Sequence, residues 1–201
     1  MVRIRLATES DRRALSELIP ASARGLSRGY YSAAQTESAI QHVFGTDSAL
    51  IADGTYFLAE EELEDAGRLR LPVRLVGCGG WSRRRTLYGG DQMKSSEDPL
   101  LDPSTEPARI RAFFVHPDCA RRGIGTRILQ ACLDAARAAG FHRVTLASTL
   151  PGVPFYAALG FEEKERLEVP MPGGMSLPVI RMERGVTPLP AGRGSEVRGR
   201  V

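Results

Sequence analysis

The sequence predicts a mixed α/β domain, and three observations support this fold class. Short runs of alternating or continuous apolar residues recur along the chain, as β-strands require. Between them lie segments with apolar residues at helical spacing, of which 124–139 is the clearest. At 201 residues, with 42% hydrophobic and 25% charged residues, the chain has the length and composition of one soluble globular domain.

The N-terminal part is expected to form a strand and two helices. Residues 2–8 alternate apolar and polar side chains, which predicts the strand. Capping residues then introduce a first helix, which Pro20 could disturb because proline removes a backbone donor. Ser32 is expected to cap the second helix, and Gly45 is expected to close it.

A hairpin and a long insertion are expected next. Strands at 55–60 and 74–82 flank the polar stretch 61–67, which indicates a solvated turn. The segment 83–107 that follows is rich in Gly, Ser, Asp and Pro. Long irregular loops in compact domains are typically functional lids or disordered excursions. Its acidic side chains, Glu97, Asp98, Asp102 and Glu106, are expected to be solvated, with attraction of a cationic amine as the alternative.

The C-terminal half should complete the sheet. Its expected elements are strands at 109–115 and 143–148, a short helix that ends at Gly160, and a closing hairpin of 163–169 and 177–183. The run 185–201 is rich in Pro, Gly and Arg and has no apolar periodicity. We therefore expect one domain over 1–184 and a disordered tail over 185–201.

A glycine-bearing loop joins the strand 109–115 to the helix that follows. Gly123 and Gly125 have no Cβ, so a ligand can approach the backbone closely. A helix start carries unpaired N–H groups and partial positive charge that attract phosphate, and Arg121 and Arg122 add charge beside it. The loop lacks the third glycine of a dinucleotide motif and the Lys-Ser or Lys-Thr of a P-loop. Taken alone, it fits a pyrophosphate cradle or an ordinary strand-to-helix turn about equally well.

A second motif makes the assignment more specific. The run Val115–Gly125 is followed, after an intervening strand, by Phe155–Phe161. Together they resemble the GNAT superfamily of acyl-CoA-dependent N-acyltransferases, whose pattern is Gln/Arg-x-x-Gly-x-Gly/Ala and then Tyr-x-x-x-Gly-Phe. The likeness in the order of elements covers about 2–183, and it implies a largely antiparallel central sheet with splayed central strands, flanked by helices. Ala120 replaces the usual Gln or Arg, at a position that contributes mainly through its backbone.

The resemblance also implies acetyl-CoA as cosubstrate and suggests which residues bind it. The backbone amides that would hold the pyrophosphate belong to Arg121, Arg122, Gly123, Ile124, Gly125 and Thr126. The pantetheine arm would bond, like an added strand, to the backbone of Phe113, Phe114 and Val115. Thr149 stands where relatives often have an Asn that bonds the cofactor, although a capping or turn role is equally open.

For the chemistry, the resemblance favours Tyr156. A phenol can donate a proton to the thiolate that leaves as an amine attacks a thioester, and it can stabilise the developing charge. Many members of the family carry a general-base Glu early in the central strand, but Arg109 and Arg111 occupy that region here. His116 is a candidate base, or it shapes the turn before Pro117.

The acceptor is expected to be a small-molecule or peptide amine, attacked directly in a ternary complex. Tyr30, Tyr31 and Trp81 are candidates to contact it, with packing in the core as the alternative for each. The insertion 83–107 is expected on the same side of the site. A non-catalytic acyl-CoA-binding or sensing module and a plain nucleotide-binding domain are the rival interpretations, and the missing strand carboxylate keeps the first of these open.

Composition argues against several other classes. Cys78, Cys119 and Cys132 are odd in number and lack metal-ligand spacing, so neither a disulfide framework nor a metal site is expected. A net charge of +3 without a dense basic tract argues against nucleic acid as a partner. No signal peptide or membrane span is apparent, so we expect a cytoplasmic protein. The fold allows a homodimer.

Overall fold

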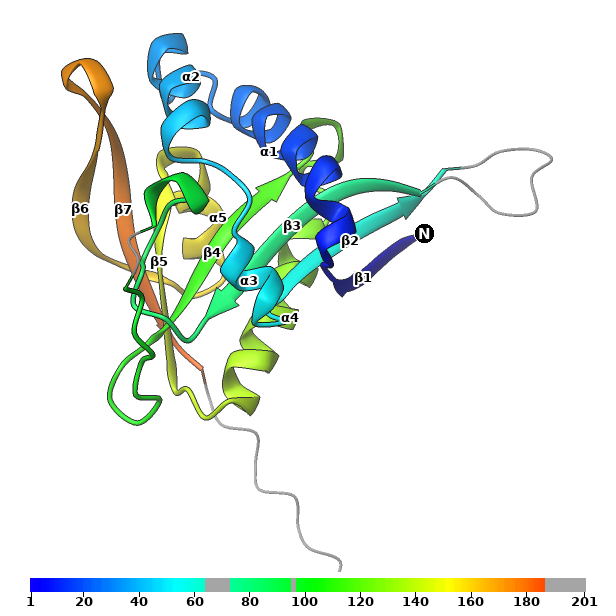
Figure 1. The fold of residues 1–201 in the computed structure, drawn as a ribbon, viewed down its shortest axis with the longest axis vertical. Helices are drawn as coiled ribbons and strands as arrows, with labels where there is room; N and C mark the ends of the chain where they lie inside the picture. The colour runs from blue at the N-terminus through cyan, green and yellow to red at the C-terminus, as the bar shows by residue number, and fades with distance from the viewer. Residues whose placement is uncertain (64–72, 95–96, 187–201) are drawn as a thin grey trace, which may run out of the picture.

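The computed structural model describes residues 1–63, 73–94 and 97–186 and builds them around one mixed sheet of seven strands (Figure 1). The strands lie in the order β1-β2-β3-β4-β5-β7-β6, and every neighbouring pair except β4–β5 is antiparallel. Their bounds are β1 Val2–Leu6, β2 Tyr56–Glu62, β3 Val73–Ser82, β4 Ala108–Val115, β5 Arg143–Thr149, β6 Glu162–Met171 and β7 Met175–Gly185. The expected α/β class with a largely antiparallel sheet is confirmed.

Helices cover both faces of the sheet and make three layers (Figure 1). Those on one face are α1 (Arg12–Leu26), α2 (Ala33–His42) and α3 (Ser48–Ala52). On the other face lie α4 (Ile124–Ala138) and α5 (Val153–Ala158), which share one apolar core. Among the described helices, none is long and apolar enough to cross a bilayer.

The α4 helix packs closely on β3, with its apolar side chains buried as the helical spacing predicts. Small residues on the strand make this approach possible. A Cβ at Gly77 would lie 2.9 Å from Ile128 Cδ1, and one at Gly79 would lie 2.8 Å from Ile128 Cγ2. Each buried aliphatic side chain of this interface stabilises the fold by about 1.5–3 kcal/mol, so the α4–β3 contact is a rigid base for the loop that precedes α4.

The two central strands separate almost as soon as they meet. β4 and β5 pair in parallel only at Ala108–Val144 and Arg109–Thr145. Beyond these pairs, the edge of β4 that faces β5 has no strand partner, which confirms the expected splay. The register of β4 against β3 also shifts between Cys78 and Gly80.

This shift is a β-bulge in β4, and it turns the strand beside the opening. Ala112, within the bulge, has a φ of +51°, a conformation that few non-glycine residues adopt. Ile110 and Phe113 pack into the α4 core, whereas Ala112 and Phe114 pack toward α1 and α3. The bulge thereby sets which β4 side chains face each side of the splay.

The helices of this face differ from the expectation in two respects, and one accommodates a possible disturbance. Pro20 lies inside α1 without ending it, and the helix continues to Leu26 because Leu15, Leu18 and Ile19 on its buried face anchor it to the sheet. α2 ends at His42, ahead of Gly45. α3, which the sequence did not reveal, is a five-residue helix capped by the Asp47 carboxylate.

The C-terminal end of the domain lies slightly later than expected. Gly185 still pairs with Arg143 in the sheet, and Val186 is buried with its N–H donating to His142 O at 2.7 Å. The folded part therefore reaches at least Val186, two residues past the expected boundary at 184. The rest of the expected disordered tail, 187–201, lies outside the described residues, as does most of the expected turn at 61–67.

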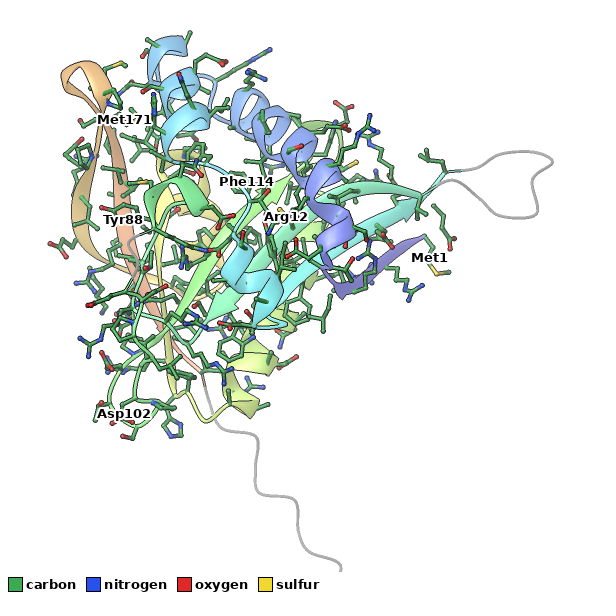
Figure 2. The ribbon with its side chains drawn as sticks, viewed as in Figure 1. Met1, Arg12, Tyr88, Asp102, Phe114 and Met171 are labelled. Carbon is green, nitrogen blue, oxygen red and sulfur yellow. The ribbon has the colours of Figure 1, made fainter. Side chains whose placement is uncertain are left out.

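The insertion 83–107 has a defined path in its described parts. Arg84 forms an antiparallel bridge with Leu100, and a 3₁₀ turn covers Asp91–Met93. Figure 2 shows Tyr88 at mid-height, on the side of the molecule where β6 and β7 lie, and Asp102 near the lower end. Of the described part of the insertion, only 87–90 reach the opening between β4 and β5.

Candidate active site

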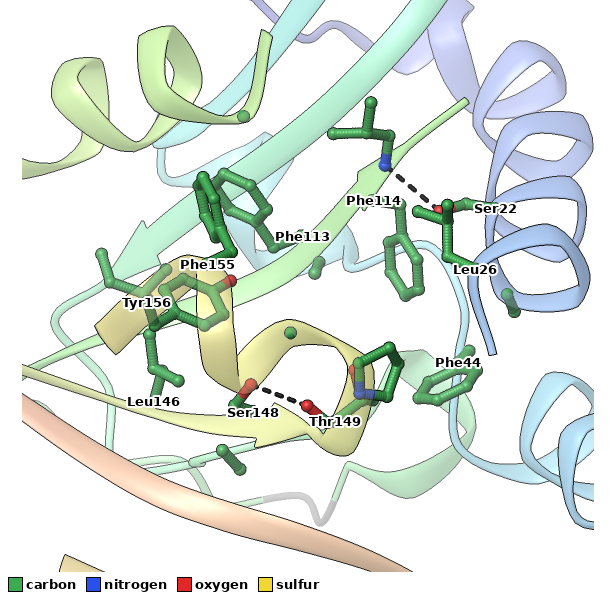
Figure 3. A pocket seen from close by; sticks show the side chains of 18 of the residues that line it. Ser22, Leu26, Phe44, Phe113, Phe114, Leu146, Ser148, Thr149, Phe155 and Tyr156 are labelled. Atoms are coloured by element: carbon green, nitrogen blue, oxygen red, sulfur yellow. Dashed lines mark hydrogen bonds between the residues drawn. The ribbon is translucent and has the colours of Figure 1, made fainter. Parts of the chain in front are cut away.

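A cavity of about 900 Å³ occupies the splay between β4 and β5 (Figure 3). One end lies at the loop before α4, and the other is lined by the links that join α1 to α2 and α2 to α3, by the insertion, and by β6 and β7. It brings together the backbone loop and the aromatic motif that the sequence singled out. We call these the cradle end (residues 120–126) and the acceptor end.

The cradle end is built from main chain. Gly123 is the N-cap of α4 and has a φ of +77°, which favours glycine. It has no side chain to cap the helix, so the first N–H groups of α4 are free to bind an anion. Arg121 also adopts a positive φ, of +62°. Neighbouring N–H groups in such alternating conformations form a concave anion site, and the α4 dipole strengthens it.

Gly125 keeps the cradle from being blocked. A Cβ there would lie 3.1 Å from Phe155 Cζ, closer than an ordinary contact. Of the predicted cradle residues, the cavity lining includes Arg121, Gly123, Ile124, Gly125 and Thr126. Arg122 is the exception.

The two adjacent arginines have different roles. Arg122 points to β2, where its guanidinium pairs with Glu61, and it does not line the cavity. Arg121 is exposed, lines the cavity and makes no ion pair within the described part of the chain. Only Arg121 is therefore available to an anion, which corrects the expectation that both arginines supply free charge there.

The edge of β4 forms the next part of the wall. Phe113, Phe114 and Val115 all line the cavity, as expected for residues that hold a pantetheine arm by their backbone. One of these amides is already engaged, since Val115 N donates to Ser22 Oγ at 3.2 Å (Figure 3). This bond ties α1 to the edge of β4, and it places the Ser22 hydroxyl in the cavity wall.

Tyr156 lies on α5 within an aromatic cluster beside β4. The rings of Phe113 and Phe155 lie 6.0 and 5.0 Å from it between centroids (Figure 3), and the ring of Phe161 lies 5.4 Å away. The residue is 7% exposed and lines the cavity, and its hydroxyl has no hydrogen-bond partner among the described residues. Burial raises the pKa of Tyr156 well above its ordinary value. The phenol therefore stays protonated and is poised as a hydrogen-bond donor.

The turn after β5 completes the cofactor side. Thr149 lines the cavity, and no hydrogen bond of its hydroxyl is present among the described residues. Ser148, which the sequence analysis did not select, also lines it and donates to Thr149 O at 2.8 Å. A Cβ at Gly152 would lie 2.7 Å from Ser148 Oγ, so glycine is needed to keep this turn tight.

Of the three aromatic residues that were candidates to contact an acceptor, the structure brings only Tyr30 to the cavity. Tyr31 is turned away: its hydroxyl donates to Pro178 O at 2.7 Å and accepts from Leu150 N at 2.8 Å. Burial raises its pKa to about 12. Trp81 is 5% exposed and packs edge-on against Phe141 in the α4 core. Tyr31 and Trp81 therefore pack in the core, as the alternative interpretation expected.

The candidate base His116 also lies off the cavity. Its Nδ1 is 2.7 Å from Arg74 Nη2 and accepts from Asp118 N at 3.3 Å, so it shapes the turn after β4. Arg109 does not line the cavity either. The described lining contains no Asp, Glu, His or Lys.

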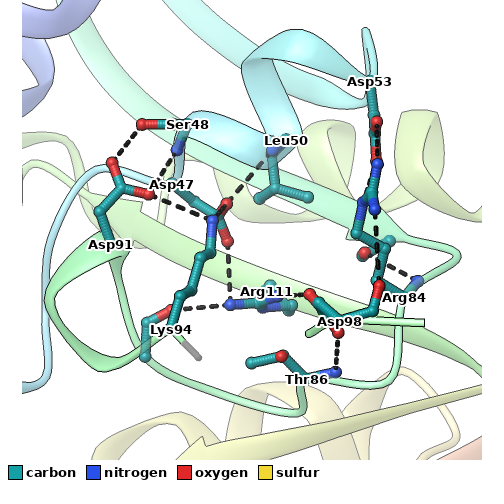
Figure 4. A network of polar contacts seen from close by, with 12 residues as sticks. Asp47, Ser48, Leu50, Asp53, Arg84, Thr86, Asp91, Lys94, Asp98 and Arg111 are labelled. Carbon is teal, nitrogen blue, oxygen red and sulfur yellow. Dashed lines mark hydrogen bonds and ion pairs between the residues drawn. The ribbon is translucent and has the colours of Figure 1, made fainter. Parts of the chain in front are cut away.

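Arg111 occupies the strand position where the resemblance leads one to expect a carboxylate, and its charge is used structurally. Its guanidinium is 1% exposed, lies 3.0 Å from Asp47 Oδ2 and donates to Gly89 O at 2.8 Å (Figure 4). Lys94 pairs with the same Asp47, and Asp98 lies 4.0 Å from Arg111. Asp98 is thus largely buried, 12% exposed, which corrects the expectation that the acidic side chains of the insertion are solvated.

These contacts hold the insertion on the body of the domain. Asp98 accepts from Thr86 N at 2.8 Å, and Arg84 forms a two-bond pair with Asp53, both bonds at 2.8 Å (Figure 4). The network places Leu87, Tyr88, Gly89 and Gly90 at the acceptor end. None of these residues was selected from the sequence, because their partners come from α3 and β4 and leave no local pattern.

Comparisons with known proteins agree with this architecture. Residues 23–161 match the model of the "Acetyltransferase (GNAT) family". An uncharacterised N-acetyltransferase of Methanocaldococcus jannaschii is 40% identical over 63 residues, which are 30% of this chain and only 28% of that protein.

Solved structures show the same fold across nearly the whole chain. A GCN5-related N-acetyltransferase from Rhodopseudomonas palustris aligns with a TM-score of 0.61 and 22% identity, over 91% of this chain and 94% of that one. The PaiA N-acetyltransferase of Thermoplasma acidophilum, solved with coenzyme A, aligns with a TM-score of 0.59 and 16% identity, over 92% and 99%. At these identities the likeness shows the fold, while the family match spans most of the chain. The chain belongs to the acetyltransferase (GNAT) family of N-acetyltransferases.

Proposed function

We propose that the protein transfers an acetyl group from acetyl-CoA to a primary amine by direct attack in a ternary complex. One observation carries this proposal. A single cavity contains the uncapped start of α4, the edge of β4 that has no strand partner, and the buried Tyr156 phenol that has no hydrogen-bond partner among the described residues. The family match and the coenzyme A in the Thermoplasma structure support the same cosubstrate.

The described residues fit coenzyme A at three points. The cradle offers free N–H groups and the uncommitted charge of Arg121 to a diphosphate. The β4 edge offers backbone groups to an extended amide-bearing arm, as in strand addition. Gly125 and Gly152 keep open the space that a side chain would fill.

Acetyl-CoA supplies an activated thioester, and the chain's own residues position and polarise it. The cradle and the β4 edge fix its orientation, which supplies much of the rate because an amine already reacts with thioesters. Tyr156 donates a hydrogen bond where negative charge develops on sulfur. Since burial raises the pKa of Tyr156, charge stabilisation is favoured over complete proton transfer from the phenol.

The thiols of the chain support direct attack over a covalent enzyme intermediate. Cys78 and Cys132 do not line the cavity, and burial raises the pKa of Cys78 to about 12. Cys119 lies in the turn that leads into the cradle and lines the cavity at that end. Cys132 lies near Tyr156 in the α4 core, but it is buried outside the cavity and burial raises the pKa of its thiol, so it is not available as a nucleophile.

The absence of a carboxylate or histidine from the described lining favours a second candidate, a module that binds acyl-CoA without turnover. Free-thiol release from acetyl-CoA, measured with a panel of aliphatic amines, polyamines, amino acids and peptides, separates the two. Transfer predicts amine-dependent thiol release, and the module predicts coenzyme A binding with no release for any amine. Competition that is equally strong from ATP or NAD would contradict both and favour a general nucleotide site.

A further inference from the structure

The acceptor end is an apolar chamber. The side chains that form it come from the links around α2, the insertion and the last two strands, and include Tyr30, Val43, Phe44, Tyr88, Leu177 and Val179. Phe44 stacks edge-on against Phe114 of β4 at a centroid distance of 5.6 Å. A ligand in this chamber therefore meets mostly hydrocarbon.

No anionic group faces the chamber from the described residues. The ionisable groups in the cavity lining are the phenols of Tyr30, Tyr88 and Tyr156, the guanidiniums of Arg111 and Arg121, and the thiol of Cys119 at the cradle end. Arg111 is committed to Asp47 and Gly89, and Asp47 is in turn shared with Lys94. An ammonium ion would thus be buried without a counter-charge, which is costly.

The chamber is also closed along two of its walls. α2 is fastened to β7 by Gln35 Nε2, which donates to Ser176 O at 3.0 Å, and by Tyr31, which bonds Pro178. The α2–α3 link is fastened to the insertion by Gly90 N, which donates to Val43 O at 2.8 Å. A polypeptide threaded through either wall would have to break these bonds.

We infer that the acceptor is a small primary amine with an apolar body, and that it binds as the uncharged free base. This inference rests on the proposed acetyl transfer and assigns the substrate class of the same site. It also removes the need for a protein base that deprotonates an ammonium ion before the attack. The C–N bond forms as the C–S bond breaks, nitrogen loses one proton and sulfur gains one, so a neutral amine and a thioester give a neutral amide and a thiol.

Protonation of the free amine then controls binding. An alkylamine with a pKa of about 10.4, like that of lysine, is only about 0.1% free base near pH 7.4. Below that pKa, the apparent affinity should rise about tenfold for each unit of pH. A site that binds the ammonium form would show no such rise.

The test is calorimetric titration of the coenzyme A-loaded protein between pH 7 and pH 9. The probes are 2-phenylethylamine, cyclohexylamine and isoamylamine, compared with spermidine and a tetra-alanine peptide. We expect at least one apolar amine to bind with the tenfold-per-unit dependence, and spermidine and the peptide to bind more weakly. Three outcomes would overturn the inference. Spermidine or the peptide binds more tightly than every apolar amine, the affinity for the apolar amines does not change with pH, or none of the three apolar amines binds.

A matched pair of variants tests the role of charge. Tyr88 is half-buried, and no hydrogen bond holds it among the described residues. Tyr88→Glu should shift the affinity ratio of spermidine to apolar amine by about tenfold toward spermidine, whereas Tyr88→Gln should not. Binding of coenzyme A by a variant shows that it is folded. If Tyr88→Glu does not fold, Tyr30→Glu, at an exposed position of the same chamber, takes its place in the test.

The two proposals fail in different ways. If the wild-type protein does not bind coenzyme A, the proposed acetyl transfer fails. If it binds coenzyme A and releases thiol with spermidine but with no apolar amine, acetyl transfer stands and the substrate class assigned here is wrong.

Discussion

The two ends of the cavity are built from different materials. The cradle end is one continuous stretch of main chain, shaped by Gly123 and Gly125 and anchored by the packing of α4 on β3. The acceptor end is assembled from side chains of four separate segments, one of which is held in place by buried charges around Arg111. Backbone geometry suits a cosubstrate whose diphosphate and amide groups do not vary, whereas side chains can change with the acceptor.

Tyr156 lies where the two ends meet, and its removal should have the largest effect. Tyr156→Phe keeps the ring within its aromatic cluster but removes the hydroxyl that, in the proposed mechanism, donates to sulfur. We expect kcat to fall by about 10²–10³-fold with an unchanged Kd for coenzyme A. Steady-state thiol release and calorimetry measure the two quantities. Equal activity of the variant would remove Tyr156 from the chemistry.

The pH dependence of the wild type sharpens this prediction. Because the pKa of Tyr156 is raised, its proton is kept as pH increases through the ordinary range for tyrosine. Activity should therefore not decline between pH 8 and pH 10 through loss of this proton. A descending limb in that range that Tyr156→Phe abolishes would contradict the assignment.

The acceptor end should be the more fragile of the two toward loss of a charge. Asp47 is fully buried between Arg111 and Lys94, so Asp47→Asn removes one carboxylate from each of these cations. Lys94 keeps Asp91, whereas the buried Arg111 keeps only Asp98, at 4.0 Å, as an ionic partner among the described residues. We expect the free energy of unfolding to fall by about 3–5 kcal/mol, measured by urea denaturation. Asp91→Asn is the matched control, because Asp91 pairs with the same Lys94 but is 39% exposed, and its loss should cost no more than about 1 kcal/mol.

At the cradle end, the backbone is the sensitive part. Gly123→Ala forces a Cβ onto a residue with a φ of +77°, where no neighbouring atom lies within 4 Å, so strain is its only direct effect. A strain of about 1–2 kcal/mol corresponds to roughly five- to thirtyfold weaker coenzyme A binding if the loop relaxes. Gly173→Ala carries the same strain, at a φ of +75° in the β6–β7 hairpin, and should leave coenzyme A binding unchanged.

The difference between the two ends also decides what the sequence could reveal. The boundaries of α4 and its glycine loop were predictable because each depends on neighbours within one local segment. Tyr156 was selected only through the resemblance to a family, since the local sequence favoured a packing role. Arg111, in contrast, is explained by Asp47, a carboxylate from a distant part of the chain that also caps α3. No local pattern records such a pairing.

Adjacent residues show the same limit at finer scale. Tyr30 and Tyr31 are adjacent residues of the same type, so the sequence could not separate their roles. Only Tyr30 lines the cavity, because the hydroxyl of Tyr31 is hydrogen-bonded to Pro178 and Leu150. Arg121 and Arg122 differ for a similar reason, because Arg122 forms an ion pair with Glu61 of β2. In both pairs the sequence identified the right segment. Which of the two residues lines the cavity depends on a partner that is distant in the sequence.

The smallest predicted effect concerns an ion pair outside the cavity, between Arg5 and Asp11. It tests whether the two ends of the cavity depend on contacts elsewhere in the fold. Hydrogen bonds from Arg5 hold the pKa of Asp11 at about 2, and the pair links β1 to the start of α1. A carboxyl whose pKa is lowered by folding stabilises the protein above its unfolded pKa near 3.9, and that stability is lost as pH falls toward about 2. Asp11→Asn should therefore lower the free energy of unfolding by about 1 kcal/mol at pH 7 and by progressively less as pH falls through this window.

Urea denaturation at pH 7 and at pH 3 measures this difference in stability. The Kd for coenzyme A and the KM for the acceptor should be the same in the variant and the wild type. A change in either constant would mean that β1 and α1 communicate with the cavity, through the Ser22 bond to β4, and that the two ends are not set by their own contacts alone.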